Sequence, residues 1–138
     1  MLAEFGAEFY FDRVRIQPGQ PLVFGRARGT FFFGLPGNPG SSMVTFELFA
    51  RAAVEILGGQ SDTKLLLAEA KLSADFRHRA GLTRFLPARL SGDGRTVAHI
   101  PWQGSSDIPA IARANAFLIA LPDKEIYNAG DPVQVLIK

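Results

Sequence analysis

The stretch from Phe31 to Ser42 limits the folds open to this chain more than any other. Its aromatic run, Phe31 to Phe33, is typical of a strand and ends at a turn rich in proline and glycine. Asn38 is a favoured residue just before a helix, and Pro39 suits the first helical position because its missing N–H is not needed there. The sequence therefore predicts a strand that passes directly into a helix, which continues to about Leu57.

The start of this helix is also a candidate binding site. The backbone amides of Gly40, Ser41 and Ser42 are expected to be unpaired at the positive end of the helix dipole, with two hydroxyls beside them. Such an arrangement can receive a phosphate or another oxyanion, although a connection without a ligand explains the same residues. No lysine of a phosphate-binding loop follows the turn, so a nucleotide hydrolase is not predicted.

The residues before the boundary that we place near residue 60 read as strands followed by the long helix. We predict the last turn of a helix over 1–6, and a hairpin between strands at 22–24 and 30–33. Apolar side chains surround most of the helix over 39–57, so other elements are expected to cover it on more than one side.

After residue 60 the sequence changes to short strands with frequent turns, at roughly the 8–12-residue spacing typical of a small barrel or sandwich. Pro87 confines the strand predicted over 84–90 to an edge or a bulge, because proline cannot donate a hydrogen bond to a neighbouring strand. One short helix, over 108–115, is expected to begin at Ser106 or Asp107.

Composition excludes several classes of protein. The 138 residues are 47% apolar and 20% charged, with a net charge of +2, which is ordinary for a globular protein and unlike a dedicated nucleic-acid binder. The chain has no cysteine, so a disulfide framework, a thiolate zinc site and a cysteine nucleophile are excluded. No apolar run approaches the roughly 18 residues of a membrane span, and we expect a soluble, cytoplasmic protein without a membrane partner.

Three further segments are candidates for ligand contacts. The stiff turn Gln17-Pro18-Gly19-Gln20 offers two amides, and the cluster Arg77-His78-Arg79 with Arg84 could bind a phosphate, but solvated loops explain both. The loop from Gln103 to Asp107 could bind a ligand through its hydroxyls and backbone amides. Alternatively, Ser106 or Asp107 in this loop simply caps the helix that follows. His78 and His99 have no second ligand type at metal-site spacing, so no zinc site is predicted.

Five segments of the chain carry a family resemblance. They are Gln17 to Gly25, Phe33 to Ser41, Val44 to Glu47, Gly104 to Ile108 and Ala112 to Ala116. In this order they resemble the C-terminal half of MoeA/gephyrin-type molybdopterin molybdenumtransferases. The Gly-Leu-Pro-Gly-Asn-Pro element is highly specific to this family. The resemblance implies an α/β plus all-β fold: the C-terminal part of a three-layer, MogA-like molybdopterin-binding domain over 1–60, and a small β-barrel domain over 61–138.

The resemblance also implies a function. Such enzymes insert molybdate into adenylylated molybdopterin in molybdenum cofactor biosynthesis, with release of AMP and with Mg²⁺ assisting. They act as cytoplasmic homodimers after a MogA-type adenylyltransferase. The residues that match the family's pterin and nucleotide site are Gln17, Gln20, Pro36, Gly37, Asn38, Pro39 and Ser41. Those that match its molybdate site are Arg84, Gly104, Ser105 and Ser106, and the catalytic residues stay unknown.

Two departures from the family matter. Where the family commonly has Lys-Pro-Gly-Lys, this chain has Gln17 and Gln20, and a hydrogen bond to a charged group contributes about 1.5–3 kcal/mol against about 1 for a neutral one. The family's dimerising domains and the first half of its pterin domain have no counterpart here. We therefore expect part of a longer enzyme, which alone does not insert molybdenum.

Two alternatives to the enzyme stay open. The missing lysines and the missing half-domain favour a non-enzymatic scaffold or interaction module derived from the same family. A small barrel that binds nucleic acid rests only on the isoelectric point of about 9.3, and basic and aromatic residues interleave too little to support it.

Overall fold

The computed structural model describes residue 4 and residues 6–138, and most of the helical turn predicted over 1–6 lies outside them. The first half contains strands and one long helical segment, in the order β1 (Glu8–Phe11), β2 (Ile16–Gln17), β3 (Val23–Ala27), β4 (Thr30–Gly34), α1 (Pro39–Thr45), the π-helical turn η2 (Phe46–Ala50) and α2 (Arg51–Leu57). The second half contains β5 (Leu67–Leu72), β6 (Phe76–Arg77), β7 (Thr83–Leu90), β8 (Thr96–His99), α3 (Ile108–Arg113), β9 (Ala116–Ala120), β10 (Ile126–Tyr127) and β11 (Pro132–Ile137).

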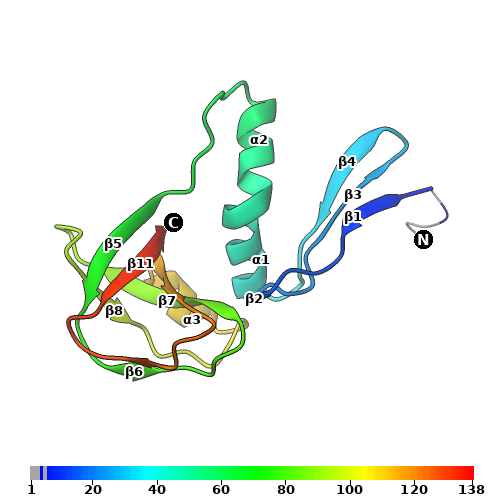
Figure 1. Ribbon diagram of the computed structural model, residues 1–138. Coiled ribbons are helices and arrows are strands. Elements are labelled where there is room, and N and C mark those ends of the chain that lie inside the picture. Colours follow the sequence, from blue (N-terminus) through cyan, green and yellow to red (C-terminus); the bar gives the residue numbers. More distant parts are fainter. Residues whose placement is uncertain (1–3, 5) are drawn as a thin grey trace.

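Strands β1, β3 and β4 form an antiparallel sheet that extends away from the rest of the molecule (Figure 1). The predicted hairpin is confirmed, with Val23 opposite Gly34 and Ala27 opposite Thr30. Arg28 and Gly29 form its turn with positive φ angles of 48° and 83°, which match the right-handed twist of a tight hairpin. Phenylalanines hold this sheet together through ring contacts, the closest at 4.5 Å between Phe24 and Phe33.

The helical segment over 39–57 has the predicted extent, with Asn38 at the N-cap position and Pro39 in the first turn. Its burial differs from the expectation. The first turns are buried, but Val54, Ile56 and Leu57 are 58%, 59% and 88% exposed. The expectation of cover on several sides is therefore wrong for α2, because the described residues cover only its beginning.

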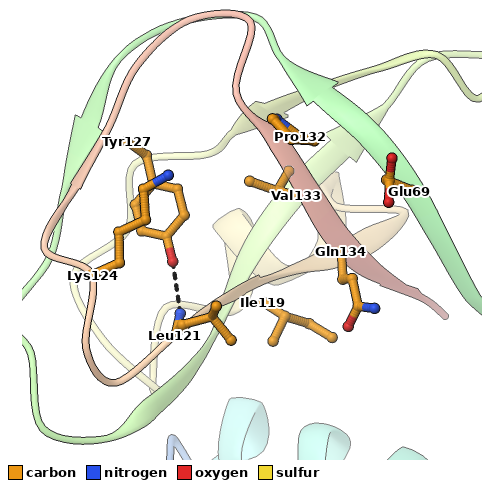
Figure 2. A pocket seen from close by; sticks show the side chains of 8 residues that line it. All are labelled: Glu69, Ile119, Leu121, Lys124, Tyr127, Pro132, Val133 and Gln134. Atoms are coloured by element: carbon orange, nitrogen blue, oxygen red, sulfur yellow. Dashed lines mark hydrogen bonds between the residues drawn. The ribbon is translucent and has the colours of Figure 1, made fainter.

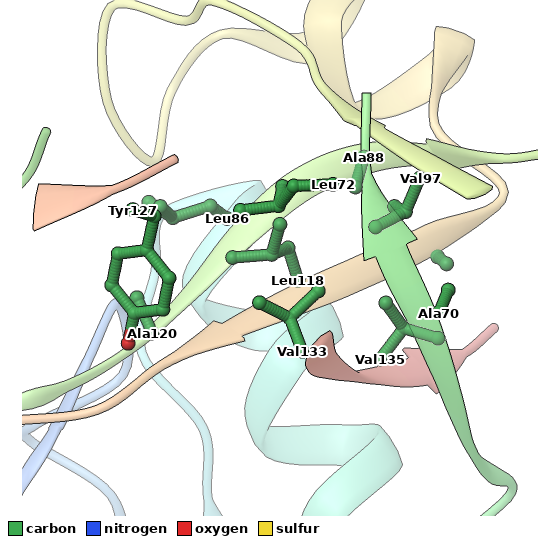
Figure 3. Close-up of a cluster of buried hydrophobic side chains, with 11 residues drawn as sticks. Ala70, Leu72, Leu86, Ala88, Val97, Leu118, Ala120, Tyr127, Val133 and Val135 are labelled. Atoms are coloured by element: carbon green, nitrogen blue, oxygen red, sulfur yellow. The ribbon is translucent and has the colours of Figure 1, made fainter. Parts of the chain in front are cut away.

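The second half forms a small closed barrel, as predicted. The six-stranded sheet runs β2-β7-β8-β5-β11-β9, and an additional pairing of β7 with β9 closes the five barrel strands. Figure 3 shows the apolar side chains that fill it. This core consists of Ala70, Leu72, Leu86, Ala88, Val97, Ala116, Leu118, Ala120, Tyr127, Val133 and Val135. The closed ring leaves the barrel strands without a free edge along their paired lengths.

Pro87 does not lie on an edge strand, and that expectation is wrong. β7 pairs with β9 on one side, and on the other with β2 at Thr83–Arg84 and with β8 from Ala88 onward. The Pro87 carbonyl accepts a hydrogen bond from the Ile100 amide at 2.8 Å, outside the paired length of β8. The missing N–H thus faces the gap between β2 and β8, so an interior strand tolerates the proline.

The two halves pack against each other. Val44 of α1 lies in one buried cluster with Phe85, Phe117 and Leu136 of the barrel. Ile16 and Gln17 of β2 pair in parallel with Thr83 and Arg84 of β7. Residues from both halves therefore meet where β2, the start of α1 and β7 come together (Figure 1). Within the described residues, no helix is long and apolar enough to cross a membrane.

Candidate anion-binding site

The turn Gln17-Pro18-Gly19-Gln20 packs directly against α1. Gly19 has a φ of +110°, and a Cβ added there would lie 2.4 Å from Thr45 Cγ2 and 3.6 Å from the Ser41 carbonyl oxygen. Only glycine fits this close approach without strain. The fold thus brings the turn and the helix start together, as a shared binding site requires.

The loop that precedes α3 contacts the same helix start. The Gly40 amide donates a hydrogen bond of 2.8 Å to the Ser105 carbonyl oxygen. A Cβ on Gly40 would lie 2.9 Å from that oxygen and 2.8 Å from Ile111 Cδ1. The turn over 17–20, the first turns of α1 and the loop before α3 therefore meet at one junction of the fold.

This contact corrects the expectation of unpaired amides at the helix start. The Gly40 amide is occupied by Ser105, and the Ser42 amide donates to the Asn38 carbonyl at 2.9 Å, as the first bond of the helix. Ser41 is only 5% exposed. A carbonyl of the barrel loop has taken the place that an anion would occupy at Gly40, because a buried helix end must satisfy its donors.

The remaining residues predicted in this region are more accessible. Gly37, Asn38 and Pro39 are exposed, and Pro36 is half-buried. The Asn38 side chain makes no capping hydrogen bond, and the Ser42 hydroxyl donates to the Pro36 carbonyl instead. The outer edge of the turn, not the buried amides behind it, is the surface that a ligand can reach.

Two predicted residues from the two halves line one cavity. Gln17 and Arg84 are partners in the parallel pairing of β2 with β7. The cavity has a volume of about 320 Å³ and is lined by Gln17, Arg79, Ala80, Gly81, Leu82 and Arg84. We call it the junction cavity. Gln20, Gly104, Ser105 and Ser106 are not among its lining residues.

The junction cavity has unpaired positive charge. Arg84 Nε is buried without a hydrogen-bond partner among the described residues. Arg79 is exposed, and its guanidinium likewise makes no hydrogen bond or ion pair within the described part of the chain. Glu125 is the acidic group close to this loop, where it accepts a hydrogen bond of 3.3 Å from the Ala80 amide.

In the loop before α3, Asp107 and not Ser106 caps the helix. Its carboxylate accepts hydrogen bonds from the backbone amides of Gln103 at 3.0 Å and Ala110 at 3.1 Å. These two bonds hold the pKa of the Asp107 carboxyl below its ordinary value, since they favour the charged form. Ser106 is exposed and stays accessible beside the cap.

A second cavity, on the barrel, was not predicted. It has a volume of about 350 Å³ and is lined by Glu69, Ile119, Leu121, Lys124, Tyr127, Pro132, Val133 and Gln134 (Figure 2). We call it the barrel cavity. Lys124 forms an ion pair of 2.9 Å with Asp131 and lies 4.5 Å above the centre of the Tyr127 ring. The sequence offers no local signal for it, because its lining comes from four separate segments.

Comparison with known proteins gives consistent matches. The model of the MoeA C-terminal region (domain IV) matches residues 69–138. A molybdopterin molybdenumtransferase of Staphylococcus aureus is 32% identical over 133 residues, which are 95% of this chain and 32% of the relative. That of Bacillus subtilis is 32% identical over 136 residues, again 32% of the relative.

Solved structures agree. A molybdopterin biosynthesis MoeA protein from a Pyrococcus species superposes with a TM-score of 0.80 and 26% identity, over 99% of this chain and 33% of that one. The chain thus spans about a third of the length of the relatives it matches.

Proposed function

This chain belongs to the MoeA family, through the C-terminal region that its residues 69–138 match, and on that premise we propose that it works as part of a molybdopterin molybdenumtransferase. In this proposal the complete enzyme inserts molybdate into adenylylated molybdopterin, releases AMP and so forms the molybdenum cofactor. It acts as a homodimer in the cytoplasm and receives its substrate from a MogA-type adenylyltransferase.

We assign the two halves different parts of this task. Residues 1–60 represent the end of a MogA-like molybdopterin-binding domain, and residues 61–138 the small barrel beside it. Gln17, Gln20 and the turn formed by Pro36, Gly37, Asn38 and Pro39, with Ser41 behind it, face the pterin nucleotide. Arg84 and the loop Gly104-Ser105-Ser106 face the molybdate.

The observation that carries the proposal is the meeting of these segments. Gly19 packs on Thr45, Gly40 bonds to Ser105, and Gln17 pairs with Arg84, although the sequence separates all of them widely. Exposed amides and hydroxyls of Gln17, Asn38 and Ser106 supply neutral hydrogen bonds around the junction, and Arg84 supplies charge. The task of these groups is to bind and orient a polyanionic substrate.

The described residues do not form a site for magnesium. No three His, Cys, Asp or Glu side chains gather there as a metal site requires. The junction cavity is lined by two guanidinium groups and by no carboxylate, a charge balance that does not suit a divalent cation. We therefore assign no step of the proposed reaction on this chain to Mg²⁺.

A chimera tests the proposal. The Bacillus subtilis relative, with its C-terminal third replaced by this chain, is expected to restore molybdenum cofactor synthesis in cells that lack their own molybdenumtransferase. The matched control is the same chimera with Gly19→Ala, which disturbs the junction. A chimera that folds cooperatively and remains inactive would contradict the proposal. That outcome would instead favour the interaction module, the reading supported by the uncharged Gln17 and Gln20.

A further inference from the structure

The antiparallel sheet of β1, β3 and β4 has two edges, and they differ in how they are protected. β1 has a bulge between Phe9 and Phe11 and begins at the charged Glu8, and both features hinder pairing with another strand. β4 has neither, because its register with β3 is regular and it contains no charged residue and no proline. Among the described residues, no strand pairs with the outer side of β4. An apolar, regular edge of this kind readily accepts a further strand.

The hairpin turn determines which backbone groups of β4 point outward. Ala27 and Thr30 flank the two-residue turn, so they exchange hydrogen bonds with each other, and the bonded positions alternate from there along the strand. Phe32 therefore bonds to β3, whereas the N–H and C=O groups of Phe31 and Phe33 face outward. These two outward positions lie symmetrically on either side of Phe32.

We propose that β4 pairs with β4 of a second copy of this chain, antiparallel and centred on Phe32, so that two three-stranded sheets join into one of six strands. Phe31 of each copy then lies opposite Phe33 of the other, and the two pairs exchange four hydrogen bonds. The symmetry of the strand selects this occupant, because the same edge complements itself about a two-fold axis. The contact does not depend on the proposed function.

The side chains on this edge fit the same arrangement. Phe31 and Phe33 lie on one face of the sheet with Phe24, whose ring is stacked with theirs at 6.0 Å and 4.5 Å between ring centres. Pairing places Phe31 of each copy beside Phe33 of the other on that face, and aromatic pairs across antiparallel strands stabilise a sheet. Phe31, which is 60% exposed in the single chain, is then covered. The two Arg28 turns lie at opposite ends of the paired strands, so their charges stay apart.

The position of the hairpin permits this contact and limits it to two copies. β3 and β4 extend away from the barrel, so their outer edge is accessible to another molecule (Figure 1). A two-fold contact uses the same surface on both copies and therefore closes at the dimer. The outer edges of the six-stranded sheet are the two β1 strands, whose bulges hinder the addition of further copies.

Single-cysteine crosslinking tests the contact, since the chain has no cysteine of its own. In the proposed register, the two Phe32 positions form a non-hydrogen-bonded pair with Cα atoms about 4.5 Å apart, within the roughly 4.4–6.8 Å that a disulfide spans. The two Thr30 positions are offset by four residues, or about 13 Å along the strand. Phe32→Cys is therefore expected to form a covalent dimer in a mild oxidant at least tenfold faster than Thr30→Cys. Phe9→Cys, on the protected edge, should crosslink no faster than Thr30→Cys.

Sedimentation velocity measures the same contact without a crosslink. Phe31→Pro removes an outward N–H while the bonds from β4 to β3 remain, and it is expected to weaken the dimer about tenfold or more. Phe9→Pro is the matched control. Phe9 lies opposite Gly25, whose backbone groups bond to β4, so the Phe9 N–H also faces outward, but on the β1 edge. This variant should dimerise as the wild type does. Thermal unfolding verifies that each variant is folded, and Phe31→Pro decides if Phe32→Cys is not.

A wild-type chain that stays monomeric would overturn the inference, because the β4 edge would then be open to some other chain. Equal weakening by Phe31→Pro and Phe9→Pro would also overturn it, since it would show association through apolar surface in general. Crosslinking that is fastest at Thr30→Cys would refute the register centred on Phe32. A dimer that is lost in Phe31→Pro, kept in Phe9→Pro and crosslinked fastest at Phe32→Cys would support every part of the inference.

Discussion

The barrel cavity and the junction cavity have almost the same volume but differ in how their positive charges are compensated. In the barrel cavity, Lys124 is paired with Asp131 and covers the Tyr127 ring, so its charge is already neutralised within the protein. In the junction cavity, Arg79 and Arg84 have no such partner among the described residues. Cavity volume therefore does not distinguish the two cavities. They differ in whether the charged side chains that line them have a partner within the protein.

The origin of the two cavities explains the difference. The barrel cavity is lined by strands β5, β9 and β11 of one closed sheet and by the segment over 121–127. The junction cavity lies where a two-residue strand from the first half joins β7, and the first half also leaves large apolar side chains exposed, including Phe31 and Leu57. The two arginines without partners thus lie where the two halves of the chain meet.

The largest expected effect comes from breaking the junction itself. Gly19→Ala places a Cβ against Thr45 at a positive φ, and we expect a loss of about 3 kcal/mol of unfolding free energy from strain and overpacking combined. Gly29→Ala is the control, because its φ is also positive but its Cβ would meet nothing within 4 Å, so about 1 kcal/mol is expected. Urea denaturation measures both. Equal losses would show that the turn does not pack on α1.

The second prediction concerns the exposed aromatic face of the first half. Phe31 is 60% exposed in the β1-β3-β4 sheet, and we expect the chain to self-associate through this face. Phe31→Ser should weaken association about tenfold or more, since burial of one such side chain contributes about 1.5–3 kcal/mol. Leu121→Ser, at a residue of the barrel cavity that is 50% exposed, should have no effect. Sedimentation velocity measures the association of the wild type and of both variants. A wild-type chain that stays monomeric at all concentrations would contradict the prediction.

The third prediction tests which residue of the turn faces the ligand. Gln17→Lys adds a positive charge to the lining of the junction cavity and is expected to raise the affinity for AMP or molybdate about fivefold. Gln20→Lys lies outside that lining and should raise it less. Isothermal titration of the two variants provides the comparison. A larger gain from Gln20→Lys would move the site away from the cavity.

The smallest effect is a pH dependence in the barrel cavity. The hydrogen bond from Lys124, followed by that from the Asn128 amide, lowers the pKa of the Asp131 carboxyl. Its folded pKa lies below the unfolded value of about 3.9, so its stabilisation is present above that pH and is lost as the pH falls through the folded pKa. Asp131→Asn should therefore show a shallower loss of stability below about pH 4. If the free energy of unfolding of the wild type and of Asp131→Asn fell equally steeply with pH below about 4, the prediction would be refuted.

Local signals predicted much of this fold. Asn38 and Pro39 mark the start of α1, Arg28-Gly29 marks the hairpin turn, and Asp107 caps α3. Each depends on a few neighbouring residues whose backbone preferences are strong. The spacing of short strands and turns indicated a small barrel or sandwich, and the family resemblance implied the barrel that the structure shows.

What the sequence did not reveal depends on contacts between distant segments. No local pattern shows that Ser105 occupies the Gly40 amide, or that Pro87 faces a gap between two partner strands. The sequence named Arg79 and Arg84 as phosphate-binding candidates, but it did not show that the pairing of β2 with β7 brings Gln17 into one cavity with them. Segments that the sequence predicted as parts of a site do lie near one another, while their individual hydrogen bonds could be read only from the fold.

Amide chemical shifts in the ¹⁵N-labelled chain during a titration with molybdate test the central claim most directly. If the junction cavity is the anion site, the largest changes are expected at Gln17, Gly81 and Arg84, and little change at Lys124 or Asp131. Changes centred on the barrel cavity, or spread evenly over surface lysines and arginines, would contradict it.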